Sequence, residues 1–282
     1  MTLISIIFAL IAERLGARSK PWQIATYANW YLTKGQALLS RLSSISSLVG
    51  LVIWLLIPTL VVAFAVHLSD FIIWQLLINT VVVLTCFGCA SMRAHYKGYL
   101  NALTRDDTEA ATLYAMQMGQ IRTEEEERGE TFAQTLAWVN FRFYCAVIFW
   151  FVLLGAPGAV FYAFVRTYYD LSEQPQSPLE HWRSALNKLI FWLDWPAARV
   201  ASFGYLVIGN FSKGTQTWLQ HVLNFSVPNR EVITQTALAA EQIELEHYGC
   251  TIEAQCMMRL VKRNILFFLA LIALLTLFGG LS

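Results

Sequence analysis

The sequence predicts an all-α, multi-pass transmembrane helical bundle with cytoplasmic helical inserts. Apolar residues make up 56% of the 282-residue chain and charged residues only 14%, whereas about a quarter of the residues in ordinary soluble domains are charged. Four stretches without Asp, Glu, Lys or Arg also reach the roughly 20 residues that a helix needs to cross a bilayer. We therefore expect a single integral membrane domain over 1–282 and exclude an ordinary soluble enzyme.

The uncharged stretches place four expected spans, at about 48–68, 71–92, 143–165 and 264–281. A short apolar segment, 1–12, precedes them and is too short to cross unless it continues past Glu13. Residues 189–209 are apolar but carry Asp194 and Arg199, and ionisable groups at membrane depth usually face a bundle interior or water. We interpret 189–209 as a polar-lined fifth crossing.

The distribution of Lys and Arg predicts the topology. The hairpin tip between the first two spans has no Lys or Arg, whereas Lys and Arg lie before the first of these spans and after the second. The positive-inside rule therefore places the inserts 13–47, 91–142 and 210–263 in the cytoplasm. Arg259, Lys262 and Arg263 precede the last span, so it too should start inside, and this requires the chain to return through 189–209.

Charge and cysteine content argue against a nucleic-acid partner and against a disulfide-stabilised fold. The net charge is +1, with 20 basic and 19 acidic residues, so no basic field indicates a nucleic-acid partner. Five cysteines are an odd number, and Cys86, Cys89 and Cys145 lie in apolar runs. We expect packed thiols and no disulfide framework.

The third strong span contains Gly155-Ala156-Pro157-Gly158 near its centre, which should break or sharply bend the helix. Two interpretations stay open. A broken helix leaves a half-helix N-terminus that attracts anions, whereas a simple kink lets a neighbouring backbone approach closely. Tyr162 and Arg166 follow the break.

Several polar residues of the second insert are candidates for ligand chemistry. Arg105 beside Asp106 and Asp107 suits a phosphate, or a divalent cation with phosphate, and the alternative is a helix cap or turn. Asp106 and Asp107 are the candidate metal ligands. His95 could titrate near neutrality, although no second ligand stands beside it. The acidic run 124–127 suits either a cation site or a solvated helix start.

Several segments of the chain together resemble the AmpE family of bacterial inner-membrane proteins, which are linked to regulation of β-lactamase expression. These segments are Arg93-Ala94-His95-Tyr96, Arg105-Asp106-Asp107, Trp138 to Tyr144 with its Asn140-Phe141-Arg142 centre, Phe149-Trp150, and Leu193-Asp194-Trp195 with Arg199. The resemblance covers nearly the whole chain. It implies a multi-pass inner-membrane regulatory or sensory protein that acts in the response to β-lactam antibiotics by ligand or partner binding.

The AmpE family is in turn similar to the CobD/CbiB family of cobalamin-pathway synthases, which join an aminopropanol arm to adenosylcobyric acid with ATP. The positions that match its motifs are Arg105-Asp106, Asn140, Phe149-Trp150, Pro157-Gly158-Ala159 with Tyr162 and Thr167, and Arg199. The departures are Val139 in place of an acidic residue, Phe143-Tyr144 in place of Asp-Gly, Ala163 in place of Arg, Arg166 in place of Asn, and Tyr169 in place of Asp. The resemblance therefore implies a retained scaffold that has lost the synthase chemistry.

The expected ligand is a small phosphate-bearing, peptidoglycan-derived or corrinoid-like molecule, and the lipid bilayer is the other expected partner. The candidate ligand-binding residues are Arg93, His95, Arg105, Asp106, Asp107, Asn140, Arg142, Tyr162, Arg166, Asp194 and Arg199. No catalytic residue or cofactor is assigned. A cobalamin-type synthase is the alternative function, and a small-molecule transporter, suggested by the broken span and by 189–209, is a further one.

Overall fold

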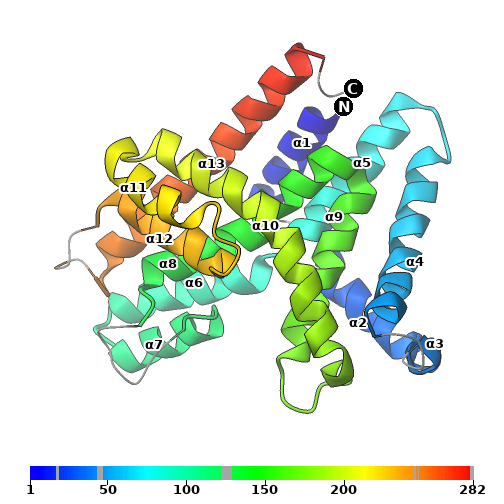
Figure 1. The fold of residues 1–282 in the computed structure, drawn as a ribbon, viewed down its shortest axis with the longest axis horizontal. Coiled ribbons are helices and arrows are strands. Elements are labelled where there is room, and N and C mark those ends of the chain that lie inside the picture. Colours follow the sequence, from blue (N-terminus) through cyan, green and yellow to red (C-terminus); the bar gives the residue numbers. More distant parts are fainter. Residues whose placement is uncertain (17–18, 43–46, 122–128, 244–245, 247, 280–282) are drawn as a thin grey trace. The chain divides into compact units, whose positions relative to one another are not determined.

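The computed structural model describes residues 1–282 except 17–18, 43–46, 122–128, 244–245, 247 and 280–282 (Figure 1). All regular structure in the described part of the chain is helical, as Figure 1 shows. The all-α prediction is therefore confirmed. Cys86, Cys89 and Cys145 are buried free thiols, as expected.

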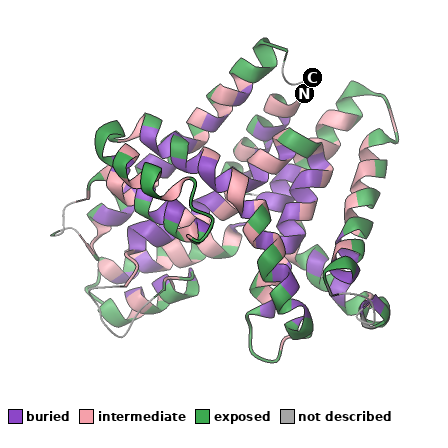
Figure 2. Cartoon of the chain, viewed as in Figure 1, coloured by how far each residue is buried: buried purple, intermediate pink, exposed green. Residues whose placement is uncertain are grey.

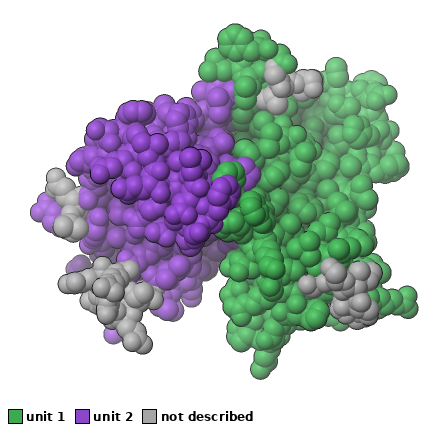
Figure 3. Space-filling view, in the orientation of Figure 1, with its two compact units in different colours: residues 1–88, 146–195, 272–282 green, residues 89–145, 196–271 purple. Residues whose placement is uncertain are grey.

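Two compact units divide the chain (Figure 3). Unit 1 contains residues 1–88, 146–195 and 272–282, and unit 2 contains residues 89–145 and 196–271. Each unit combines segments that are far apart in the sequence. The single membrane domain over 1–282 stays a prediction.

Unit 1 is built around the helix that follows residue 145. Its helices are α1 (Thr2–Leu15), α2 (Ile24–Lys34), α3 (Gln36–Leu42), α4 (Ser47–His67), α5 (Ile72–Phe87), α9 (Ala146–Ser172) and the first part of α10 (Arg183–Ile208), with short 3-10 turns at Lys20–Trp22 and Glu180–Trp182. Helices α4 and α5 both pack against α9, and α1 packs against α5. The core includes Trp54, whose ring stacks on Tyr31 at a centroid distance of 4.0 Å.

Unit 2 contains two of the three inserts that the sequence places outside the membrane, 91–142 and 210–263, whereas 13–47 belongs to unit 1. The helices of unit 2 are α6 (Ala90–Leu103), α7 (Thr108–Gln117), α8 (Phe132–Asn140), a π-helical turn (Phe141–Cys145), the rest of α10, α11 (Phe211–His221), α12 (Asn229–Glu241) and most of α13 (Thr251–Leu277). Helix α6 packs on α7, and α12 packs on both α8 and α11. The Tyr99 and Phe132 rings stack in its core.

Three helical segments of the described chain are long and apolar enough to cross a membrane: Leu48–His67, Phe132–Ser172 and Thr251–Leu277. A bent pair, Ile72–Phe87 and Ala90–Leu103, makes a fourth if it forms one broken span. Figure 2 shows exposed and half-buried residues along α4. They include large apolar residues, with Phe64 71% and Val61 63% accessible. Such a surface suits lipid, because soluble proteins rarely expose large contiguous apolar patches. The chain is a membrane protein.

The expected second span, 71–92, is interrupted. Helix α5 ends at Phe87 and contains only 16 residues, because Gly88 adopts the left-handed conformation with φ 38°. A Cβ atom at position 88 would lie 3.0 Å from the carbonyl oxygen of Thr85. Glycine therefore lets the chain turn here within an otherwise apolar stretch.

The expected fifth crossing, 189–209, lies within α10, which begins earlier, at Arg183. Helix α10 is not among the candidate spans found in the described residues. Its length of 26 residues would suffice, but Arg183, Lys188, Asp194 and Arg199 interrupt its apolar sequence. The N-terminal segment 1–12 forms most of α1, and the Glu13 side chain is buried.

The expected break in the third strong span is confirmed. Gly155 has φ 70° and ψ −162°, a non-helical conformation inside α9. This region of backbone space is essentially restricted to glycine. A Cβ at the nearby Gly158 would lie 2.6 Å from the carbonyl oxygen of Trp150, so the bend also brings two parts of the α9 segment into close approach.

Candidate functional site

The sequence-predicted site residues are divided between the two units. Unit 2 contains Arg93, His95, Arg105, Asp106, Asp107, Asn140, Arg142 and Arg199, and unit 1 contains Tyr162, Arg166 and Asp194. Within each unit the structure brings some of these residues together and leaves others apart.

Arg105, Asp106 and Asp107 form the exposed turn between α6 and α7. Asp106 is left-handed, with φ 56°. The Asp107 side chain accepts a hydrogen bond of 2.9 Å from the backbone N–H of Ala110 and so caps α7. The interpretation of this tripeptide as a helix cap and turn is therefore confirmed, because the carboxylate of Asp107 satisfies a free N–H of the first helical turn.

Arg93 contacts the π-helical turn 141–145. Its guanidinium donates to the hydroxyl oxygen of Tyr144 at 2.8 Å, and the Cys89 thiol lies 2.8 Å from the same oxygen. His95 lies on α6 as well, with its ring 6.5 Å from that of Tyr114. The structure thus joins Arg93 to the Asn-Phe-Arg-Phe-Tyr block, whereas His95 faces an aromatic ring.

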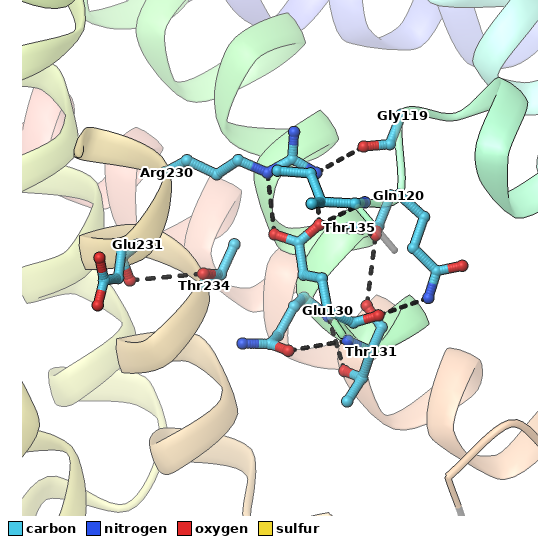
Figure 4. Close-up of polar contacts among 10 residues, drawn as sticks. Gly119, Gln120, Glu130, Thr131, Thr135, Arg230, Glu231 and Thr234 are labelled. Atoms are coloured by element: carbon cyan, nitrogen blue, oxygen red, sulfur yellow. Dashed lines mark hydrogen bonds and ion pairs between the residues drawn. The ribbon is translucent and has the colours of Figure 1, made fainter. Parts of the chain in front are cut away.

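Arg142 belongs to a polar group that we call the Trp138 cluster: Glu130, Trp138, Arg142 and Arg230. The guanidinium of Arg142 lies 5.9 Å from the centroid of the Trp138 ring, and that of Arg230 lies 5.7 Å from it. Both distances are those of cation–π contacts. Arg230 also donates through Nε to Glu130 Oε1 at 2.9 Å and through Nη2 to Glu130 Oε2 (Figure 4).

The local sequence explains how this cluster is placed. Glu130 lies next to Thr131, the N-cap of α8, which forms a capping box with Gln134. Arg230 is the second residue of α12, and it also donates to the carbonyl oxygen of Gly119 at 2.6 Å (Figure 4). Since α8 and α12 pack together, residues 100 positions apart form one ion pair whose side chains are 10% and 22% exposed.

The Trp138 cluster carries two guanidinium groups against one carboxylate. It thus places the Arg142 and Arg230 guanidinium groups beside one indole ring. Such a group can attract an anion and stack on a planar ring. Glu130 and Arg230 were not among the sequence-predicted site residues.

Arg199 has a different role in unit 2. Its side chain is buried and donates from Nε to the carbonyl oxygen of Val222 at 3.1 Å and from Nη1 to Asn229 Oδ1. A longer contact of 3.5 Å joins Nη2 to the carbonyl oxygen of Asn224. Arg199 therefore holds the connection between α11 and α12. Asn140 is also buried and accepts a weak bond from the Cys145 thiol.

Unit 1 contains the other candidates in a buried setting close to the Gly155 break. The Tyr162 hydroxyl donates to Asp194 Oδ1 at 2.8 Å, and the Arg166 guanidinium donates to the carbonyl oxygen of Cys86 at 3.0 Å. Tyr162 and Arg166 are one helical turn apart on α9 and so share a face. Arg166 satisfies a carbonyl in the last turn of α5, where such groups lack partners within the helix.

Within the described ranges, no three or more His, Cys, Asp or Glu side chains are placed to hold a metal ion. The acidic run 124–127 lies outside these ranges.

Comparison with known proteins places this geometry in context. The family model of the regulatory signalling modulator protein AmpE matches residues 1–282. Protein AmpE of Shigella flexneri is 27% identical over 290 aligned residues that cover all of both chains. The cobalamin biosynthesis protein CobD of Chromobacterium violaceum is 28% identical over 100 residues, which are 36% of this chain and 32% of that protein. No solved structure matches the chain.

Proposed function

The chain belongs to the AmpE family of regulatory signalling modulator proteins, and from this premise we propose that it modulates β-lactamase expression in the response to β-lactam antibiotics. It resides in the bacterial inner membrane and acts by binding a ligand or a partner, not by catalysis. The observation that carries the proposal is the match to the family over all 282 residues of a chain with membrane-length helices.

Arg199, which matches a synthase motif, and Asp107, which adjoins another, support a role without catalysis. Arg199 donates its hydrogen bonds to the connection between α11 and α12. The neighbour of Asp106, Asp107, caps α7, and Arg105 and Asp106 lie on the exposed turn before it. Arg199 and Asp107 stabilise the protein's own fold, which fits a scaffold that kept its shape while the chemistry was lost.

The Trp138 cluster is the binding site that we propose for the regulatory ligand. Its two guanidinium groups and its indole ring suit a small phosphate-bearing or peptidoglycan-derived molecule. Arg142 lies over the Trp138 ring, and Arg230 is already held by Glu130, so Arg142 is the side chain to change first.

Induction of a chromosomal β-lactamase tests the proposal. In cells that lack this chain, nitrocefin hydrolysis after a sub-inhibitory β-lactam should differ from that in the parent, and the wild-type chain should restore the parental value. The Arg142→Ala variant should fail to restore it at equal abundance in the membrane, whereas Lys188→Ala, at an exposed position of α10, should succeed. Unchanged induction after deletion would refute the proposed function, and full restoration by Arg142→Ala would refute the proposed site alone.

A cobalamin-pathway synthase is the second candidate, favoured by the partial similarity to CobD. Arg105, Asn140 and Arg199 would then belong to a site for adenosylcobyric acid and ATP. Val139 and Phe143 count against it, because a ligation that consumes ATP requires carboxylates that hold Mg²⁺ and phosphate.

A further inference from the structure

Unit 2 contains a hollow that the proposed function does not use. It has a volume of about 310 Å³, at the small end of ligand-binding pockets. Its walls come from α6 and from the first half of α13, and they include Tyr96, Gln255, Cys256, Met258, Arg259 and Lys262.

The charge of this hollow is positive. Arg259 and Lys262 are exposed and lie three residues apart, on neighbouring positions of one helix face. Arg259 donates to the Cys256 sulfur at 3.1 Å, which fixes its guanidinium beside the hollow. None of the residues that line the hollow is Asp or Glu.

One carboxyl, that of Glu241, interacts with Arg259. Burial raises the pKa of the Glu241 carboxyl, and the charges of Arg259 and Arg263 oppose that rise. Arg263 in addition donates to the carbonyl oxygen of Ile208. No ion pair of Lys262 occurs within the part of the chain that the structure describes, so this ammonium group is available to an anion.

The position of the hollow along α13 indicates the kind of anion. Residues 264–277 of this candidate span carry no charge, and the two cations lie just before them. Cations at the end of an apolar span lie at the level of the lipid headgroups, and basic pockets on the cytoplasmic side bind anionic headgroups.

We propose that this hollow binds a phosphate group, with Lys262 and Arg259 as the cations that contact it. An anionic phospholipid headgroup is the source that the position favours, and a soluble phosphate ester shares the same chemistry. Tyr96 and Gln255, which also line the hollow, are other residues there with polar side-chain groups. This site is separate from the Trp138 cluster and does not depend on the proposed function.

Binding to the full-length protein in a neutral detergent tests the proposal. Short-chain phosphatidylglycerol is titrated in one arm, glycerol 3-phosphate in a second and short-chain phosphatidylcholine in a third. We expect phosphatidylglycerol to bind more tightly than phosphatidylcholine, and each cation removed should weaken its binding about fivefold at low salt. The double variant Arg259→Ala/Lys262→Ala should bind about thirtyfold more weakly, and Lys262→Arg should bind as the wild type does.

The control is Lys34→Ala, which removes an exposed lysine that does not line the hollow. Binding of both phosphatidylglycerol and glycerol 3-phosphate supports a general phosphate site, and binding of the lipid alone supports a headgroup site. Equal affinity of the wild type, the double variant and the control for phosphatidylglycerol would overturn the proposal, as would equal affinity of the wild type for phosphatidylcholine. Because the side chains of Arg259 and Lys262 are exposed, the double variant should have the same thermal unfolding midpoint as the wild type. If it unfolds instead, Lys262→Glu provides a second variant.

Discussion

Replacement of Arg199 tests whether this residue holds the fold. Arg199→Ala removes two well-formed hydrogen bonds, to the Val222 carbonyl oxygen and to Asn229 Oδ1, from a buried side chain. A hydrogen bond to a charged group contributes about 1.5–3 kcal/mol, so the free energy of unfolding should fall by about 3–6 kcal/mol. Arg199→Lys can restore only part of this set, since an ammonium group lacks the planar fork of a guanidinium.

The effect should also be local to the connection between α11 and α12. Leu223 is 77% and Phe225 55% exposed in this connection, so chymotrypsin can report its opening. We expect Arg199→Ala to lower the thermal unfolding midpoint in detergent and to speed cleavage at these two residues. Arg105→Ala, at the exposed α6–α7 turn, should change neither measurement. Wild-type stability and wild-type cleavage of Arg199→Ala would refute the structural role.

Three other perturbations follow from the geometry. Gly155→Ala should lower the unfolding free energy by about 1–3 kcal/mol, because position 155 needs a glycine-specific backbone conformation, although a Cβ atom there would make only an ordinary contact of 3.7 Å with Pro157 Cδ. An unchanged unfolding midpoint would contradict this. Glu130→Gln should lower the free energy of unfolding by about 1–3 kcal/mol, because it weakens the ion pair with Arg230. A double-mutant cycle with Arg230→Met that shows no coupling energy would contradict this prediction. Burial raises the pKa of Tyr31 to about 12, so the stability that the neutral phenol contributes below pH 10 should be lost as the pH rises towards 12. The difference in phenolate absorbance between the wild type and Tyr31→Phe should therefore titrate near pH 12. A titration near pH 10 would contradict the burial of this side chain.

Features of the fold that depend on local sequence could be predicted. The long uncharged stretches indicate membrane helices, and Gly155 with Pro157 indicates the break in α9. The early end of α5 could not be predicted, because a single Gly88 among apolar residues is compatible with a continuous membrane helix. The left-handed turn there depends on packing, which one sequence does not reveal.

The candidate site likewise combines one feature that follows from local sequence with others that depend on packing. The cap formed by Asp107 is a local pattern and was one of two open interpretations. The pairing of Glu130 with Arg230 joins residues 100 positions apart, and no spacing rule links them. Arg199 was predicted to bind a ligand, but its partners on the 222–229 connection became evident only from the packing of α10 against that segment.

The central claim is that the chain keeps the synthase scaffold without its ligation chemistry, and that Arg199 now holds the connection between α11 and α12. Growth of a cobalamin-requiring strain that lacks its own synthase tests it most directly. With this chain present in the membrane fraction and adenosylcobyric acid supplied, we expect no growth, whereas an authentic synthase restores it. Growth supported by this chain, and abolished by Arg105→Ala, would contradict the claim.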